Sequence, residues 1–341
     1  MTTTTASTDD LDDPRAGSLA LVPLRRLLEA PIVATFRLSP GERPLVAQGE
    51  VVVPGAPLAE RLRDARTDVI EAPADAEPGS WFTAPTGRHR KLGADRGEYL
   101  FRSGGRWRIG AGDQAEPLEA PFGGIVRAVA QGSHLTVETS ARGVLGADVL
   151  AGPSSGRLHR IAGRDGQVRA AEIDVTSAGA ILVAGSAIDA EAITKARALG
   201  VRGIIVGGLG VKERREVMAS ERRGRAGVHG LPPFAVLVLD GAIGRPIASP
   251  IMDILDALEG RTVAIVDAPA CLVVDDAIEL PVPPANLVRI TAGPLAGAEG
   301  TWEGLAGPQR FTGGVVLEAG RVRLGGRTSV AIPLGDLERF A

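Results

Sequence analysis

Between residues 176 and 280, short apolar runs alternate with amphipathic segments. The apolar runs are AILVAGS, VRGIIVGG, FAVLVLDG and RTVAIVDA, and the segments between them are DAEAITKARALG, VKERREVMASERRG and SPIMDILDALEG. Asp189 is a suitable N-cap for the first segment, and helix ends are expected at Gly200, Gly224 and Gly260. Strands that are apolar on both faces and alternate with helices predict a small α/β domain over residues 176–280, with a parallel sheet covered on both faces.

The chain on either side of this segment has the shorter alternation that is typical of β-structure. Val51 to Val53 form a β-branched run between Gly49 and Gly55, which predicts a strand bounded by turns. We expect a β-rich domain over residues 19–175, and the linker PVPPANLV at 281–288 leads to a second β domain over 284–341. The polar, acidic residues 1–18 are predicted to be a disordered tail. The predicted fold class is therefore multidomain, α/β plus β.

In the C-terminal stretch VRITAGPLAGAEGTWEGL, residues 288–305, Gly293, Gly297 and Gly300 interrupt a run of alternating apolar positions. Gly293 and Gly297 are predicted to allow a tight reversal of the chain. Gly300 is predicted to allow a close backbone approach that a Cβ atom would obstruct.

This order of apolar positions and glycines resembles the KOW motif. The closing segment RVRLGGRTSVAIPLGDLERF resembles the last strands of the C-terminal barrel of NusG-type proteins, so the resemblance covers about residues 284–340. It implies an SH3-like barrel whose exposed loops bind RNA or a protein partner such as the ribosome or RNA polymerase. Residues at the equivalent loop positions are Arg289, Pro294, Leu295, Trp302, Arg310 and Phe311, of which Trp302, Arg310 and Phe311 are the candidate partner-binding residues. Trp302 is either a recognition residue or part of the barrel's core.

Two stretches of the N-terminal region, QGEVVVPGAPLAE and APFGGIVRAV, resemble the halves of biotinyl/lipoyl-type domains. They come in swapped order, as in the N-terminal region of Rnf-type C subunits. The resemblance implies a barrel-sandwich hybrid. The chain has no lysine at the hairpin tip that carries lipoate or biotin, and no iron–sulfur cysteines. We therefore expect the fold without either chemistry, and no cofactor.

An insertion at residues 80–110 interleaves basic and aromatic residues. Cations hold phosphates and aromatic rings stack on bases, so this composition suits a nucleic-acid surface. A second basic cluster lies on the segment VKERREVMASERRG. The candidate nucleic-acid-binding residues are Arg88, Arg90, Lys91, Arg106, Arg108, Lys212, Arg214 and Arg215. The alternatives are a β-hairpin with its aromatic residues in a core and its arginines in water, and a solvated helix face.

Glycine-rich turns follow the apolar runs of the α/β segment. In an open parallel sheet, ligands bind beyond the carboxyl ends of the strands, where backbone N–H groups can hold an anion. The candidate ligand-binding residues there are Ser186, Gly207, Gly208, Gly210, Asp240 and Gly241. The turn GGLG lacks both the P-loop lysine and the dinucleotide-binding spacing, and Asp240 has no histidine or serine partner nearby in the sequence. Tight β–α turns also use glycine for geometry alone.

The composition of the chain argues against several kinds of protein. The 341 residues carry a net charge of −3, with 3 % aromatic residues and a single cysteine, Cys271. One cysteine excludes an internal disulfide, and the four histidines lack ligand spacing, so no metal site is expected. No apolar run approaches the roughly 18 residues of a membrane-spanning helix, and we expect a cytoplasmic location.

No catalytic constellation is visible in the sequence. We therefore expect a non-enzymatic adaptor on RNA, ribosome or RNA polymerase rather than an enzyme. One alternative is a sensor or enzyme that binds a phosphate-containing metabolite at the strand-end loops. Another is a structural subunit of a larger assembly.

Overall fold

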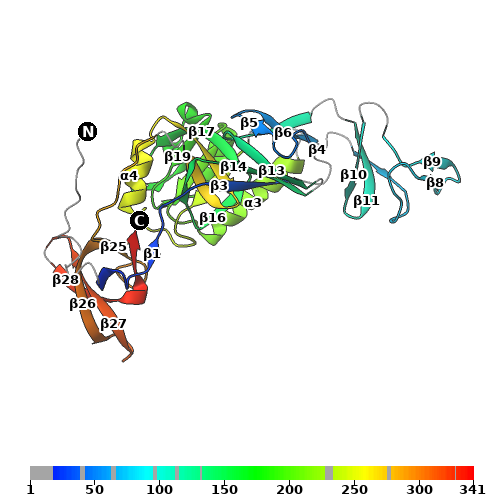
Figure 1. Cartoon of the computed structure of the whole chain (residues 1–341). Helices are drawn as coiled ribbons and strands as arrows, with labels where there is room; N and C mark the ends of the chain where they lie inside the picture. The colour runs from blue at the N-terminus through cyan, green and yellow to red at the C-terminus, as the bar shows by residue number, and fades with distance from the viewer. Residues whose placement is uncertain are drawn as a thin grey trace.

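A nine-stranded mixed sheet forms the centre of the molecule (Figure 1). The structure is a computed structural model that describes residues 18–38, 43–62, 67–94, 98–111, 115–130, 133–226, 233–274, 278–326 and 328–341. In spatial order the strands are β16 (Asp148–Ala151), β22 (Ala235–Val238), β21 (Gly203–Val206), β19 (Ala180–Val183), β17 (Ser154–Arg160), β23 (Thr262–Asp267), β24 (Ala270–Val274), β15 (Arg142–Leu145) and β2 (Leu28–Glu29). The run β22-β21-β19-β17 is parallel, and the other neighbours pair antiparallel.

Helices cover both faces of the parallel half of this sheet, which confirms the predicted α/β unit in outline. On one face, α2 (Ala190–Ala198) and α3 (Val211–Ala226) share a core with alternate strand residues such as Leu182 and Ile204. On the other face, α4 (Ser249–Ala257) packs on Ile181 and Ile205. The Asp189 carboxylate accepts a hydrogen bond from the Ala192 N–H, as predicted for the N-cap. The helix end expected at Gly224 is wrong, because α3 continues to Ala226.

The fourth predicted strand, β23, departs from the expected parallel sheet. It pairs antiparallel with β17. The chain leaves α4 beside β17, where the Gly260 N–H donates to the Leu158 carbonyl, so β23 starts near that end and runs the opposite way. Strands β15, β16 and β17 all precede residue 176, so the sheet crosses the boundary expected between 19–175 and 176–280.

Two smaller sheets from the N-terminal region pack against the antiparallel half of the central sheet. One has the order β3-β14-β13-β5 (Ile32–Arg37, His134–Thr139, Gly124–Ala130 and Val51–Val52). The other has the order β12-β6-β4 (Ala115–Glu119, Pro57–Leu62 and Arg43–Pro44). Their core joins Phe36, Leu58 and Val126 with Cys271 and Val273 of β24. Among the described residues, no sheet closes into a barrel.

The C-terminal sheet has the order β1-β29-β25-β26-β27-β28. Its strands are β1 (Leu24–Arg25), β29 (Leu337–Phe340), β25 (Leu287–Ile290), β26 (Glu299–Arg310), β27 (Val316–Leu324) and β28 (Thr328–Pro333). Gly293 and Gly297 have positive φ values of 77° and 92°, as a tight reversal requires. A Cβ atom on Gly300 would lie 2.5 Å from the Arg323 carbonyl oxygen, which confirms the predicted close approach.

An arm projects from the body between β6 and β12 (Figure 1). It contains a three-stranded sheet in the order β10-β11-β7 (Glu98–Ser103, Arg106–Ala111 and Thr67–Ile70) and a hairpin of β8 (Trp81–Thr83) and β9 (His89–Lys91). Buried apolar side chains of the arm, such as Phe82, Leu92 and Phe101, belong to none of the cores of the body. The arm therefore packs mainly on itself. Apart from Ser18, the tail expected over residues 1–18 lies outside the described residues.

Candidate functional site

The arm tip, residues 79–94, presents an indole ring beside basic side chains. Trp81 pairs with Lys91, Phe82 with Arg90 and Thr83 with His89. Directly paired residues share a face of an antiparallel hairpin, so Trp81 and Lys91 lie on one face and Arg90 on the other. Phe82 is buried, whereas the Trp81 side chain is 69 % exposed and His89, Arg90 and Lys91 are all exposed.

The arm tip carries positive charge and no carboxylate of its own. Residues 79–94 include Arg88, Arg90 and Lys91 and no carboxylate. Within the described part of the chain, these three cations form no ion pair. Exposed cations without counter-ions are suited to phosphate groups, since only water competes for them.

The base of the arm is built differently. The Arg102 guanidinium lies 5.5 Å from the centre of the Trp107 ring and donates to the Ala74 carbonyl. The Trp107 Nε1–H donates to the Ala76 carbonyl at 3.0 Å. These contacts hold the segment after β7 onto the sheet, so Trp107 and Arg102 stabilise the arm. The same segment carries the exposed carboxylates Glu71, Asp75 and Glu77, and Asp68 is exposed on β7 itself.

Arg106 and Arg108 lie on β11, in the sheet of the arm. Arg106 is exposed after the Gly104-Gly105 turn, and Arg108 is half-buried. A hollow of about 480 Å³ lies between the tip and β10, lined by Pro78, Gly79, Lys91, Leu92, Gly93 and Leu100. Lys91 therefore borders both the exposed face of the tip and this hollow.

The second basic cluster lies on α3, on the body rather than on the arm (Figure 1). Arg214 is engaged there, because its guanidinium donates to Asp148 at 2.6 Å and to the Leu209 carbonyl at 3.1 Å. Lys212 and Arg215 are exposed. The structure thus does not join the two basic clusters predicted from the sequence into one surface.

At the carboxyl ends of the parallel strands, the space beside the glycine-rich loops is occupied by another segment of the same chain. A Cβ atom on Gly207 would collide with the Arg245 carbonyl oxygen, and one on Gly208 with that of Ile243. The Gly207 and Gly208 N–H groups donate to the carbonyls of Gly185 and Ser186. A ligand cannot lie against these two glycines without displacing the loop, and their N–H groups are not available to an anion.

The neighbouring candidates are also engaged in contacts within the chain. The Ser186 hydroxyl is buried and donates to the carbonyls of Asp165 and Gly166. The Gly241 carbonyl accepts from the Leu209 N–H, and Gly210 lies against the Glu213 carboxylate. For all these positions, the structure favours the geometric role of the turn residues.

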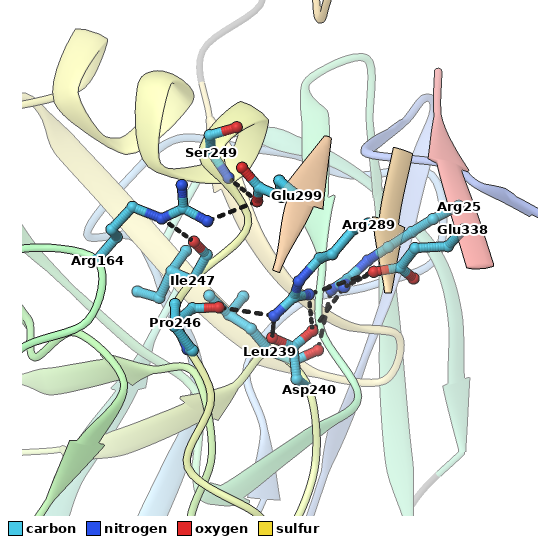
Figure 2. Close-up of polar contacts among 10 residues, drawn as sticks. All are labelled: Arg25, Arg164, Leu239, Asp240, Pro246, Ile247, Ser249, Arg289, Glu299 and Glu338. Carbon is cyan, nitrogen blue, oxygen red and sulfur yellow. Dashed lines mark hydrogen bonds and ion pairs between the residues drawn. The ribbon is translucent and has the colours of Figure 1, made fainter. Parts of the chain in front are cut away.

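Asp240 lies in a buried ionic cluster (Figure 2). Arg289 of β25 donates to both its carboxylate oxygens, at 3.1 and 2.8 Å, and Arg25 of β1 donates at 2.6 Å. Glu338 of β29 lies 3.2 Å from Arg289 and 3.5 Å from Arg25. Burial by itself would raise the pKa of Asp240, but the hydrogen bonds and charges of the two arginines outweigh it and hold that pKa below its usual value. A carboxylate held in this way is unsuited to act as a base.

This cluster fastens the C-terminal sheet to the strand-end loops. Arg289 also donates to the Pro246 carbonyl at 2.6 Å. A second contact lies nearby, where Glu299 of β26 accepts from Arg164 at 2.7 Å and from the Ser249 N–H at 2.7 Å (Figure 2). Arg289, which the sequence analysis placed at a loop position of the resembled barrel, is therefore a buried structural residue.

The remaining candidates lie on the C-terminal sheet. Trp302 is 5 % exposed, shares a core with Val288, Ile290 and Val322, and its Nε1–H donates to the Ser18 hydroxyl. Its position favours the core-filling interpretation and leaves its ring unavailable to a partner. Arg310 is exposed and Phe311 half-buried, at the tip of the β26–β27 hairpin.

Sequence reasoning missed two features of these sites. Trp81 is not among the site residues predicted from the sequence, although the flanking run of cations without carboxylates, residues 79–94, points to it. The partners of Asp240 could not be found, because Arg25 and Arg289 lie 215 and 49 positions away in the sequence.

Within the described residues, no three histidine, cysteine, aspartate or glutamate side chains are grouped so that they could hold a metal ion. None of the described helices has the length and apolar character needed to cross a membrane. Among known proteins, no family model and no curated sequence matches this chain.

Proposed function

We propose that this chain is a non-enzymatic RNA-binding adaptor whose arm tip contacts the nucleic acid. The observation that carries this proposal is the arm tip itself, where Arg88, Arg90 and Lys91 lie beside the exposed Trp81 with no carboxylate among them. A large share of protein–nucleic acid affinity comes from cations that displace the counter-ions of the phosphates, and the tip offers such cations at the end of a projecting arm.

The second half of the proposal is that the C-terminal sheet, whose described strands form an open sheet rather than the closed SH3-like barrel that the sequence predicts, holds a protein partner as KOW-type domains do. Two features support it. Strand β25 pairs antiparallel with both β26 and the last strand, β29, so the end of the chain returns beside the start of the C-terminal segment. Apolar side chains are also exposed on the β26–β27 hairpin, at Val315, Val316 and Leu317 near its tip and at Leu305 in the middle of β26. Arg310 and Phe311 at this tip are the residues proposed to contact the partner.

The arm-tip proposal predicts a specific salt dependence. Changing Arg88, Arg90 and Lys91 together to alanine removes three phosphate-binding charges. We expect RNA affinity to fall about tenfold to a hundredfold at roughly 0.15 M salt, and the slope of log K against log salt to become shallower by about 2, since each contact to a single strand contributes about 0.7. Fluorescence anisotropy with a labelled mixed-sequence RNA over a salt series measures both quantities.

The matched control is the double variant Lys212→Ala/Arg215→Ala, which removes exposed charge from α3 instead. It should leave the affinity close to that of the wild type. An unchanged slope in the arm-tip variant would exclude these residues as RNA contacts, and a shallower slope in the α3 variant would move the site to the body.

A further inference from the structure

The exposure of Trp81 is unusual for this chain. Aromatic residues make up only 3 % of the sequence, and the chain has three tryptophans. Trp302 is buried in the C-terminal core and Trp107 is partly buried in the arm, where it donates a hydrogen bond. The 69 % exposed Trp81 is thus the tryptophan whose ring faces solvent.

The structure gives Trp81 no packing role that would explain its exposure. The described cation–π contacts place Arg102 over Trp107 and Arg197 over Phe234, and none lies over Trp81. The core of the tip is made by its strand neighbour Phe82, which is 7 % exposed. The indole ring is therefore open to a flat partner, and Lys91 stands directly beside it on the same face.

We propose that the arm tip binds single-stranded RNA, with one unpaired base stacked on Trp81 and an adjacent phosphate held by Lys91. This inference rests on the proposed function and narrows its substrate class. In a duplex, each base is already covered by its neighbours and presents only its edge in a groove. A flat aromatic ring on a hairpin can stack only on a base that has left the helix.

The charge distribution of the arm limits the contact to a few nucleotides. Strand β9 has three residues and spans roughly 10 Å at about 3.3 Å per residue. Towards the base of the arm, the exposed carboxylates Glu71, Asp75 and Glu77 repel a phosphate backbone. A short single-stranded segment or loop therefore fits this surface better than a long duplex.

The central test is Trp81→Ala in the full-length chain. Replacing an aromatic residue that stacks on a base with alanine lowers affinity by about 5- to 150-fold. We therefore expect the Trp81→Ala variant to bind single-stranded RNA more weakly than the wild type by a factor in that range. Trp81→Phe keeps an aromatic face and should restore most of the loss. Because the side chain is exposed, neither variant should change the melting temperature, and Val282→Ala, at an 88 % exposed position far along the chain, controls for loss of apolar surface.

Two further measurements test the geometry. Stacking should quench tryptophan emission when RNA is added, and this change should disappear in Trp81→Phe while Trp107 and Trp302 remain. The losses of RNA-binding free energy caused by Trp81→Ala and Lys91→Ala should be non-additive in the double variant, because the two side chains are neighbours. Arg90 lies on the opposite face, so the losses caused by Arg90→Ala and Trp81→Ala should add.

The outcomes separate this inference from the proposed function. If duplex and single-stranded RNA bind equally and Trp81→Ala has no effect, the inference is wrong. The function still stands in that case, provided that the triple cation variant weakens binding. If the wild-type chain binds neither RNA at low salt, both are wrong.

Discussion

At the scale of single residues, Arg289 shows why a buried charge needs several partners. Its side chain is 3 % exposed, and its guanidinium donates to Asp240, Glu338 and the Pro246 carbonyl. A planar guanidinium can serve these acceptors at once, whereas a lysine ammonium offers no such fork. The two carboxylates and two arginines balance in charge, so each compensates for the burial of the others.

The Asp240→Asn substitution tests this cluster. It leaves Arg25 and Arg289 with one carboxylate between them. Removing one partner of a buried ion pair costs about 3–5 kcal/mol, and we expect a loss near 3 kcal/mol because the amide oxygen still accepts a hydrogen bond. Chemical denaturation measures the change, with Asp253→Asn at an exposed helix position as the control. A loss no larger than that of the control would show that the cluster is not stabilising.

The pH dependence of the same variant gives a second readout. The pKa of Asp240 is lower in the folded chain than in the unfolded chain, so its contribution to stability is complete above its ordinary pKa of about 3.9. That contribution is lost as pH falls through the lowered folded pKa. The difference in unfolding free energy between wild type and Asp240→Asn should be constant between about pH 5 and 7 and should shrink below about pH 4.

At the scale of secondary-structure elements, the sequence predicts whether a segment forms a helix or a strand more accurately than it predicts which strand lies next to it in the sheet. The apolar runs of β19, β21 and β22 are buried along their whole length, and such runs are recognisable in the sequence. The antiparallel pairing of β23 with β17 depends on where α4 ends in space. The local periodicity of the sequence carries no information about that position. Strand β17 (SSGRLHR) mixes buried and exposed positions, and this concealed its central place in the sheet.

The packing of Trp302 of β26 against Gly320 of β27 can be tested by substitution. The Trp302 ring lies against Gly320, so a Cβ atom at that position would collide with the ring. Gly320→Ala must displace the indole, and we expect a destabilisation of about 1–3 kcal/mol, as for overpacked cores. Gly335→Ala, where a Cβ atom meets open space and φ is not positive, should change the unfolding free energy much less. Equal effects in thermal unfolding would mean that Trp302 is loosely packed.

At the scale of the whole molecule, the nine-stranded sheet organises the other parts. The N-terminal sheets and α2–α3 share one face of it, while α4 and the end of the chain, at Phe340, lie on the other. The ionic cluster fixes the C-terminal sheet to this body at the ends of its parallel strands (Figure 2). The arm, by contrast, enters and leaves through one pair of strands, β6 and β12, which is the arrangement of an inserted module.

This arrangement predicts that the arm can be removed without unfolding the body. Leu62 of β6 and Ala115 of β12 are directly paired, so an Asn-Gly type I′ turn can connect them in place of residues 63–114. No described residue of the arm belongs to the core around Phe36 and Leu58, so the shortened chain should melt within a few degrees of the wild type. It should also lose its affinity for single-stranded RNA to at least the extent of the triple cation variant. Aggregation or a broad, non-cooperative transition would show that the arm is part of the body, and a cooperatively folded chain that still bound RNA would place the contact elsewhere.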